Sequence, residues 1–524
     1  MQFKKSLLLL AALGGLMAAC QPDSGNAPTS PTRETIVETV VVTELIEGEA
    51  VEVVVTATGA TEYSPAPPES PEGPQDNYFQ DYGLNPFFDP AVDPLSTFAI
   101  DIDTGSYTVA RRYIEDGLIP PAEAVRPEEF VNYFDQGYAP PANNAFAVYT
   151  DGAPSPFSDD GTYILRFGVQ GYEIPDWERK PVRLTLVIDV SGSMEQDKRL
   201  ELVKDAVEIL VGRLREGDRV AVVAYSTSAW IVLDPTDAGA ANKIMAAVNS
   251  LRPTNSTNAE AGLTLGYAMA TTMFDPAVTN RVILLSDGVA NVGDTSPGGI
   301  LDTVANYARD GTTLTTIGVG MGNFNDVLME QLADRGDGGY AYVDTLDEAE
   351  KIFGEGLVGT LQTIAFDAKI QVVFNPQVVS GYRLIGYENR EVADSDFRND
   401  AVDAGEIGAG HSVTALYAVH FHPGVAGEVA RLHLRWEDPD TREVVEIARA
   451  VQTGDLANRF DAAAPRFQLS VVVAEYAEVL KESPWATGVR FEDVAQHALR
   501  LSGLLGDEAV QEFALLVTMA ALLR

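Results

Sequence analysis

Short apolar runs that each end in polar residues constrain the fold of this chain more than any other feature. The run at 184–188 leads into Asp189, Ser191 and Ser193, and the run at 281–286 leads into Asp287. Between about 181 and 353, such runs alternate with stretches whose apolar residues recur at helical spacing. Strands that alternate with helices of this length predict βαβ units and a doubly wound, mainly parallel α/β sheet of the Rossmann-like kind.

The same patterns predict the positions of individual elements. After Ser193 a helix is expected to run to the stop signal at Glu216-Gly217-Asp218. Further strands are expected at 219–224, 230–233, 313–319 and 339–343. Further helices are expected at 240–250, 259–273, 300–309, 325–333 and 346–353.

The polar residues at the strand ends predict a binding site for a hard cation. In an open α/β sheet, ligands bind at the carboxyl ends of strands where the strand order reverses. Thr257 precedes the helical stretch 259–273 and adds a third hydroxyl, so five oxygen donors are expected in one crevice: Asp189, Ser191, Ser193, Thr257 and Asp287. A strand end with a helix cap would explain 189–193 alone, but it does not explain the later oxygen donors.

The chemistry of these donors favours a partner over a substrate. Carboxylate and hydroxyl oxygens are ligands that Mg²⁺ and Ca²⁺ accept. Hydroxyls are neutral, so an ion held mainly by Ser and Thr keeps much of its charge and leaves one coordination position for an outside carboxylate. We therefore expect a Glu or Asp of a protein partner to complete the coordination shell.

With these residues in place, the stretch 179–355 resembles a von Willebrand factor type A (VWA) domain. Asp189-Val-Ser191-Gly-Ser193, then Thr257, then Ser286-Asp287-Gly288 match that family's metal-ion-dependent adhesion site in order. The resemblance implies that Ser191, Ser193 and Thr257 contact the metal, while Asp189 and Asp287 act mostly through bound water. It implies Mg²⁺ as the ion, with Ca²⁺ or Mn²⁺ as alternatives.

The chain departs from the family pattern just before the threonine. The family commonly has two glycines there, whereas this chain has Asn255 and Ser256. Glu260 follows in the first turn of the next helix, where the helix dipole stabilises a carboxylate. Alternatively, Glu260 lies near the ion, raises the local negative charge and favours Ca²⁺ over Mg²⁺.

The N-terminal segment predicts export and attachment to a membrane. Lys4 and Lys5 precede an apolar run and small residues that lead to Cys20, the only cysteine of the chain. Residues 1–20 resemble a bacterial lipoprotein signal, which implies a lipidated Cys20 and an extracytoplasmic location in the bacterial envelope, at the outer membrane or cell surface. The alternative is a signal peptide with an incidental cysteine. Residues 21–78 are rich in Pro, Ser, Thr, Glu and Val and predict a disordered, low-complexity stalk, although the valine-rich part favours a transient strand.

Two further regions flank the expected VWA domain. The stretches 93–107 and 125–134 resemble the N-terminal region of a family of bacterial exported proteins that carry this domain. This assigns 79–178 to an N-terminal α+β region, with a strand at 96–102 and helices at 106–116 and from Pro127. Residues 356–524 resemble the family's uncharacterised C-terminal region, expected to be β-rich over 356–460 and helical over 465–524.

The charge of the chain excludes some partners. Asp and Glu number 77 against 36 Lys and Arg, which gives a formal net charge of −41. Such a chain is repelled by nucleic acid and by an anionic bilayer surface. No segment after the signal is apolar enough to cross a membrane, and the short run 513–523 is expected in a core.

Two patterns suggest an enzyme, and both have simpler explanations. Asp101-Ile-Asp103-Thr104-Gly105 resembles the nucleophile loop of aspartate-dependent phosphatases, but the usual order of the glycine and threonine is exchanged, and a helix cap at Asp103 or Thr104 explains the residues. His420 and His422 are expected on one face of a strand, without a third metal ligand. The expected function is therefore a non-enzymatic, membrane-anchored binding protein. A metal-assisted hydrolase and a structural envelope protein whose metal only stabilises loops are the alternatives.

Overall fold

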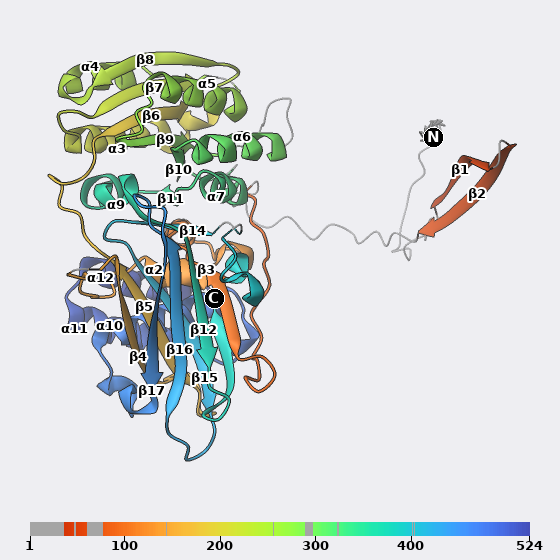
Figure 1. The fold of residues 1–524 in the computed structure, drawn as a ribbon, viewed down its shortest axis with the longest axis vertical. Helices are drawn as coiled ribbons and strands as arrows, with labels where there is room; N and C mark the ends of the chain where they lie inside the picture. Colours follow the sequence, from red (N-terminus) through yellow and green to blue (C-terminus); the bar gives the residue numbers. More distant parts are fainter. Residues whose placement is uncertain are drawn as a thin grey trace, which may run out of the picture. The chain divides into compact units, whose positions relative to one another are not determined.

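The computed structural model describes residues 77–524 except 143, 255, 289–296, 322–323, 401 and 403, together with two strands in the preceding part. The chain divides into two compact units, Met1–Glu72 and Gly73–Arg524 (Figure 1). Within the described residues, no helix is both long and apolar enough to span a membrane.

The first unit contains an antiparallel hairpin of β1 (Ile36–Ile46) and β2 (Glu49–Gly59), with Val41 opposite Val54. Valine alternates there with Glu and Thr, and β-branched residues favour a pleated strand. This hairpin falls within 21–78, where the sequence predicts a stalk whose valine-rich part favours a transient strand. The signal 1–20 and Cys20 lie outside the described residues.

The predicted α/β domain is present and has a six-stranded sheet in the order β11-β10-β9-β6-β7-β8. Neighbouring strands are parallel except for the edge strand β8, which is antiparallel to β7. The strands are β6 (Val182–Asp189), β7 (Arg219–Tyr225), β8 (Ala229–Asp237), β9 (Thr279–Ser286), β10 (Thr312–Val319) and β11 (Tyr340–Val343). The chain runs from β6 outward to β7 and later returns to β9 on the other side of β6, so the strand order reverses between β6 and β9.

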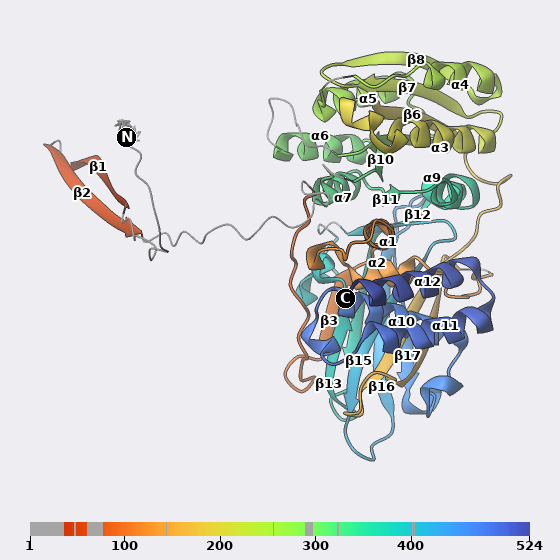
Figure 2. The same ribbon diagram turned by 180° about the vertical axis from the view of Figure 1, so that it is seen from behind.

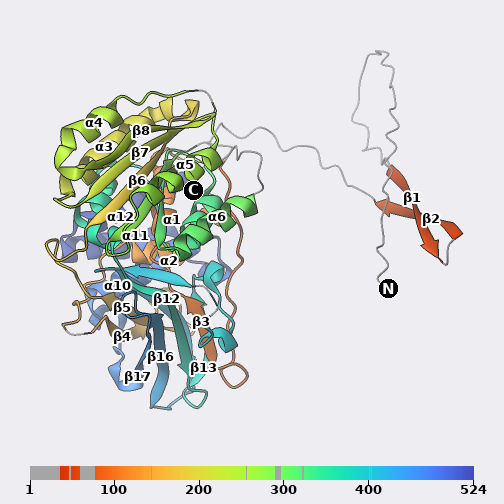
Figure 3. The same cartoon turned by 45° about the horizontal axis from the view of Figure 1, so that its top comes forward.

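Helices cover both faces of this sheet, as a buried parallel sheet requires (Figure 3). One face packs against α3 (Arg199–Arg213) and α4 (Ala241–Asn249). It also packs against a continuous helical segment made of α8 (Leu346–Glu350), a π-helical turn (Lys351–Glu355) and α9 (Leu357–Leu361). The other face packs against α5 (Ala259–Thr272), α6 (Pro297–Arg309) and α7 (Asp326–Arg335). Most of the predicted helices and strands of this domain are confirmed to within a few residues.

The strands on either side of the α/β domain form one β-sandwich, in the lower part of Figure 1. In one sheet β3 (Leu95–Ala99) pairs with β12 (Thr363–Phe374), and Thr97 lies opposite Gln371. In the other, β5 (Tyr163–Gly171) pairs with β15 (Ser412–Phe421). The remaining strands are β4 (Phe146–Pro154), β13 (Val379–Ile385), β14 (Gly405–Gly408), β16 (Glu428–Glu437) and β17 (Val444–Gln452). The predicted boundaries 79–178 and 356–524 separate two regions that the structure joins in a common core, with the α/β domain inserted between them.

Helices cover the outer face of the sheet that contains β5 and β15 (Figure 2). They are α1 (Gly105–Glu115), α2 (Pro127–Asn132), α10 (Pro465–Leu480), α11 (Phe491–Leu505) and α12 (Glu508–Leu523). α12 buries Phe513 and Val517, which confirms that the apolar run 513–523 belongs to a core. Pro127 stands at the first position of α2, as predicted.

A carboxyl group in this helical layer makes stability depend on pH. Burial, with Glu478 nearby, raises the pKa of Glu475 in α10 to about 8, and its Oε1 has no hydrogen-bond partner. Arg383 pairs with Glu478 at 3.1 Å and so does not satisfy Glu475. In the unfolded chain Glu475 releases its proton near pH 4.3, so the folded state binds more protons above that pH and its stability falls as pH rises through about 8.

We predict that Glu475→Gln removes this dependence. The urea midpoint of the variant should match that of the wild type near pH 5 and exceed it at pH 8.5. The difference in unfolding free energy at pH 8.5 should be about 4 kcal/mol, because each pH unit between the two pKa values contributes about 1.4 kcal/mol. Glu492→Gln, at an exposed position of α11, is the control and should not change the pH profile. An equal effect of Glu475→Gln at both pH values would contradict the prediction.

Candidate metal centre

The carboxyl ends of β6 and β9 bring two of the predicted donors into the same crevice. The strands are parallel neighbours, with Val187 opposite Leu284 and Ile188 opposite Leu285. Asp189 ends β6 and Asp287 follows β9, and both side chains are buried. The convergence predicted from the strand ends is therefore present, at the point where the strand order reverses.

Asp189 is held in place by hydrogen bonds to both carboxylate oxygens. The N–H of Ser191 donates to Oδ1 at 2.8 Å. The hydroxyls of Ser286 and Tyr225 donate to Oδ2 at 2.8 Å and 3.1 Å. A buried carboxylate with three donors has a fixed orientation, which suits an outer-shell role in orienting ligands or water around an ion.

The two serines and Asp287 form a continuous set of oxygen atoms. The Ser191 and Ser193 hydroxyls lie 3.0 Å apart, and the Ser193 hydroxyl donates to Asp287 Oδ1 at 3.0 Å. Ser191 is the residue before the short helical segment Gly192–Lys198, so the loop turns directly after the strand. Oxygen atoms at this spacing fit the coordination shell of a hard divalent cation.

Arg199 balances the charge of Asp287. Its Nη1 lies 2.8 Å from Asp287 Oδ2, and its side chain is 4% exposed. Nη2 also donates to the carbonyl of Met321. The side chain of Arg199 packs directly against the backbone of Gly320, and a Cβ added at that glycine would lie 2.1 Å from Nε. Gly320 also has a φ of +76°, which favours glycine. Arg199 therefore holds one oxygen of Asp287 and leaves Oδ1 facing the serines.

Thr257 lies in the loop before α5 and is half-buried. Thr254 anchors this loop, because its N–H and its hydroxyl donate to the carbonyl of Val190 at 2.6 Å and 3.0 Å. Among the described residues, the side chain of Thr257 forms no hydrogen bond with Asp189, Ser191, Ser193 or Asp287. The structure thus joins four predicted donors directly and places Thr257 on a loop tied to the residue between Asp189 and Ser191.

The electrostatics of the crevice favour a cation. Burial and the neighbouring Asp287 raise the pKa of Asp189 to about 6. A divalent ion beside two such carboxylates would stabilise their ionised forms. The donors are all oxygen atoms, so the residues fit Mg²⁺, Ca²⁺ or Mn²⁺.

Two contributors to the centre were not predicted. Tyr225 lies opposite Asp189 in the parallel register of β7 and β6, and its position at the end of a strand was the available signal. Arg199 starts the helix after the serine loop, and its sequence position alone does not indicate which carboxylate it meets. Glu260 is in the first turn of α5, where the helix dipole stabilises its carboxylate.

The residues of the two patterns that suggested an enzyme have partners within the fold. Thr104 is the N-cap residue of α1, which is one of the two predicted positions, but its side chain makes no capping hydrogen bond. Asp103 Oδ1 accepts the N–H of Tyr340 at 2.8 Å. His420 lies 2.9 Å from the Thr162 hydroxyl and stacks on Phe87, while the ring of His422 lies beside the carbonyl of Pro376. The histidines therefore have different surroundings and do not converge on one ion.

The fold and the oxygen donors define a VWA domain, and comparison with known families agrees. The von Willebrand factor type A domain family matches residues 184–355. A family described as von Willebrand factor matches 73–165, and the family of the C-terminal part of uncharacterized protein YfbK matches 359–426 and 421–523. VWA domains are commonly metal-dependent protein-interaction modules.

Uncharacterized protein YfbK of Escherichia coli is 35% identical over 454 residues, which span 81% of this chain and 78% of that protein. The chain therefore belongs to the VWA family, together with YfbK. Uncharacterized protein sll0103 of Synechocystis is 26% identical over 282 residues, or 52% of this chain and 66% of its own length. The solved structure of a von Willebrand factor type A protein from Catenulispora acidiphila aligns with 71% of this chain and 89% of its own, with 16% identity and a TM-score of 0.41.

We predict that Tyr225→Phe weakens the centre without removing a predicted metal ligand. The change leaves Asp189 Oδ2 with one donor fewer in a fully buried place, which costs about 1–2 kcal/mol of stability. Because Asp189 then loses orientation, Mg²⁺ affinity should fall about tenfold or more. Calorimetric Mg²⁺ titration and thermal unfolding measure the two effects.

Tyr267→Phe is the matched control for this variant. Tyr267 is equally buried in the same core, but its hydroxyl has no hydrogen-bond partner. Its removal should leave stability and Mg²⁺ affinity unchanged or slightly improved. Equal losses in both variants would mean that the hydroxyl of Tyr225 has no special role.

Proposed function

We propose that this protein binds a protein partner through a divalent cation held by Asp189, Ser191, Ser193, Thr257 and Asp287. A Glu or Asp of the partner completes the coordination shell. Mg²⁺ is the proposed ion. The observation that carries the proposal is the chain of hydrogen bonds from the Ser191 hydroxyl through Ser193 to Asp287 at the carboxyl ends of β6 and β9.

The charge distribution of the centre supports an outside carboxylate. The two serine hydroxyls are neutral, and Asp189 accepts three hydrogen bonds that spread its charge. Arg199 holds Oδ2 of Asp287 at 2.8 Å, so this carboxylate neutralises the ion less than a free one would. An ion that keeps its charge attracts an acidic side chain of a partner strongly.

We propose further that the site acts outside the cytoplasm of a bacterial cell. The support is the lipoprotein-like sequence that ends at Cys20, the only cysteine of the chain. A diacylglycerol with a further acyl chain on this residue would anchor the protein stably, whereas one chain is marginal. Adhesion and assembly of an envelope complex both agree with this location.

A capture experiment tests the mechanism. The full chain is incubated with an envelope extract in Mg²⁺ or in EDTA, and bound proteins are identified after cross-linking. We predict that partners captured in Mg²⁺ are lost in EDTA and lost with Ser191→Ala plus Ser193→Ala. The reason is that direct ligands should matter at least as much as outer-shell groups, whose loss costs about 10–100-fold in metal affinity.

The control variant carries Ser250→Ala plus Ser502→Ala, two serines whose hydroxyls bond to carbonyls of their own helices. It should capture the same partners as the wild type. Partners that persist in EDTA and in the Ser191/Ser193 variant would overturn the metal-bridged mechanism. Mg²⁺ binding without any captured partner would indicate that the ion only stabilises the loops.

A further inference from the structure

A second group of acidic side chains lies away from the VWA centre, among the sandwich, its covering helices and α7. Two sets of three buried carboxylates each have oxygen atoms within 4.8 Å of one another, and both contain Asp101. One set adds Asp103 and Glu330, and the other adds Glu128 and Glu129. These residues include the Asp101-x-Asp103 sequence that suggested a phosphatase loop.

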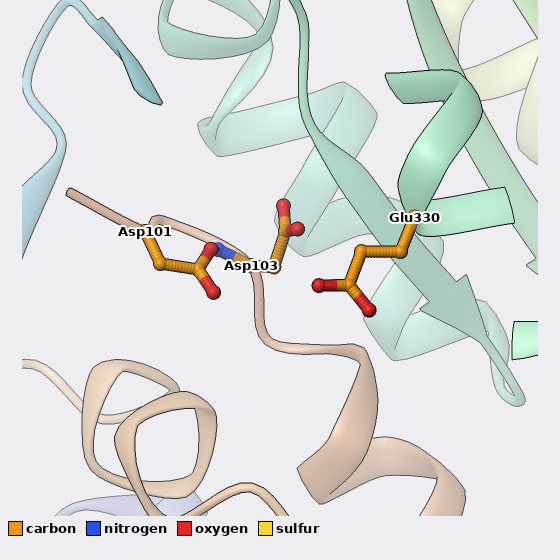
Figure 4. Close-up of side chains that lie close together, drawn as sticks. All are labelled: Asp101, Asp103 and Glu330. Atoms are coloured by element: carbon orange, nitrogen blue, oxygen red, sulfur yellow. The ribbon is translucent and has the colours of Figure 1, made fainter. Parts of the chain in front are cut away.

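The first set already has its counter-charge. The guanidinium of Arg390 lies 3.1 Å from Asp101 and 3.2 Å from both Asp103 and Glu330. In Figure 4 Asp101 and Asp103 lie on the same loop, and the side chain of Glu330 extends toward that loop from the right of the view. Arg390 therefore acts as the cation of this set.

In the second set, Glu128 lacks a counter-charge. Asp101 pairs with Arg390, and Glu129 pairs with Arg126 and accepts the N–H of Ser106 at 2.7 Å. Glu128 is 2% exposed, and neither of its carboxylate oxygens has a hydrogen-bond partner. A buried carboxylate without partners is costly, so this one calls for a bound cation or a proton.

The surroundings of Glu128 add negative charge and leave room for its carboxylate. The nearby Lys481 lies 3.3 Å from Glu388 and is paired with it. Glu128 Oε2 approaches Gly386, where φ is +79° and an added Cβ would lie 2.2 Å from that oxygen. Among the described residues of this ionic group, the basic side chains are Arg126, Arg390 and Lys481, and the acidic ones are Asp101, Asp103, Glu128, Glu129, Asp326, Glu330, Asp334 and Glu388. Negative charge is in clear excess.

We propose that Asp101, Glu128 and Glu129 bind a divalent cation, in a second metal site separate from the VWA centre. The spacing fits Ca²⁺, because two oxygens on opposite sides of this ion lie about 5 Å apart. The three ligands here are carboxylates, whereas the VWA centre uses neutral hydroxyls. With its charge largely neutralised by the protein, this ion has little attraction for an outside acid and serves to stabilise the structure.

The position of the proposed site lets this ion stabilise the loop between β3 and α2 and the contact of the sandwich with the VWA domain. Asp101 follows β3, and Glu128 and Glu129 lie in α2, so the ion fixes the loop between them. Glu129 pairs with Arg126 and Asp101 pairs with Arg390. These two arginines reach Asp326, Glu330 and Asp334 of α7 in the VWA domain. Loss of the ion would therefore loosen the contact between the VWA domain and the sandwich.

The test separates the two metal sites by mutation. The full chain with Ser191→Ala plus Ser193→Ala serves as the parent, and its Ca²⁺ binding is measured by equilibrium dialysis. The parent should retain one Ca²⁺ per chain, and its melting temperature should fall in EGTA. Adding Glu128→Gln should weaken the binding at least about tenfold and abolish the response to EGTA. Adding Glu123→Gln, at an exposed neighbouring position, should change neither measurement.

A proton on Glu128 is the competing way to relieve its charge, since burial with Glu388 and Asp101 nearby raises its pKa to about 7. If the parent binds no Ca²⁺, or if Glu128→Gln binds it equally well, the proposal is wrong. Circular dichroism in EGTA checks folding, and Glu128→Gln should be at least as stable as the parent there because it removes an unpaired charge. If that variant is unfolded, Glu128→Asp replaces it and should also weaken Ca²⁺ binding, whereas unchanged binding would overturn the proposal.

Discussion

Two buried guanidinium groups hold together parts of the chain that lie far apart in sequence. Arg126 precedes α2 and pairs with Glu129 beside it and with Asp326 of the VWA domain. Arg390 lies in the sandwich part and pairs with Asp101, Asp103, Glu330 and Asp334. Removing one partner from such a group leaves an uncompensated buried charge, which is strongly destabilising. The VWA domain is thus tied to the sandwich by interactions that tolerate little displacement.

Arg111 adds a third connection of the same kind. It lies in α1, is 3% exposed, and pairs with Asp344 at 2.5 Å and with Glu348 at 3.2 Å, both at the end of the VWA domain. Its Nη1 also reaches Glu512 of α12. The planar guanidinium offers five donors, so one arginine can join three elements where a lysine would serve fewer. This helps an acidic chain to use its few basic residues at the places where its parts meet.

The carboxylates of the VWA centre are held mainly by hydrogen bonds rather than by several ion pairs. Asp189 is surrounded by hydrogen-bond donors, and Asp287 is shared between Ser193 and Arg199. These contacts orient the carboxylates while leaving neutral hydroxyls beside them. A site of this composition is suited to an ion that still attracts a ligand from outside, in contrast to the all-carboxylate group at Asp101, Glu128 and Glu129.

The sequence by itself determined the α/β domain and the strand ends that bring Asp189, Ser191, Ser193 and Asp287 together, because strand period, helix period and the residues after each strand are local properties. It also indicated the β-strands and helices of the flanks. Only the tertiary structure decided that β3 pairs with β12 and that β5 pairs with β15, since pairing between strands separated by an inserted domain leaves no local pattern. The same holds for Asp101 and Asp103: their spacing suggested a catalytic loop or a cap, and their ion pairs with Arg390 became visible only in the folded chain.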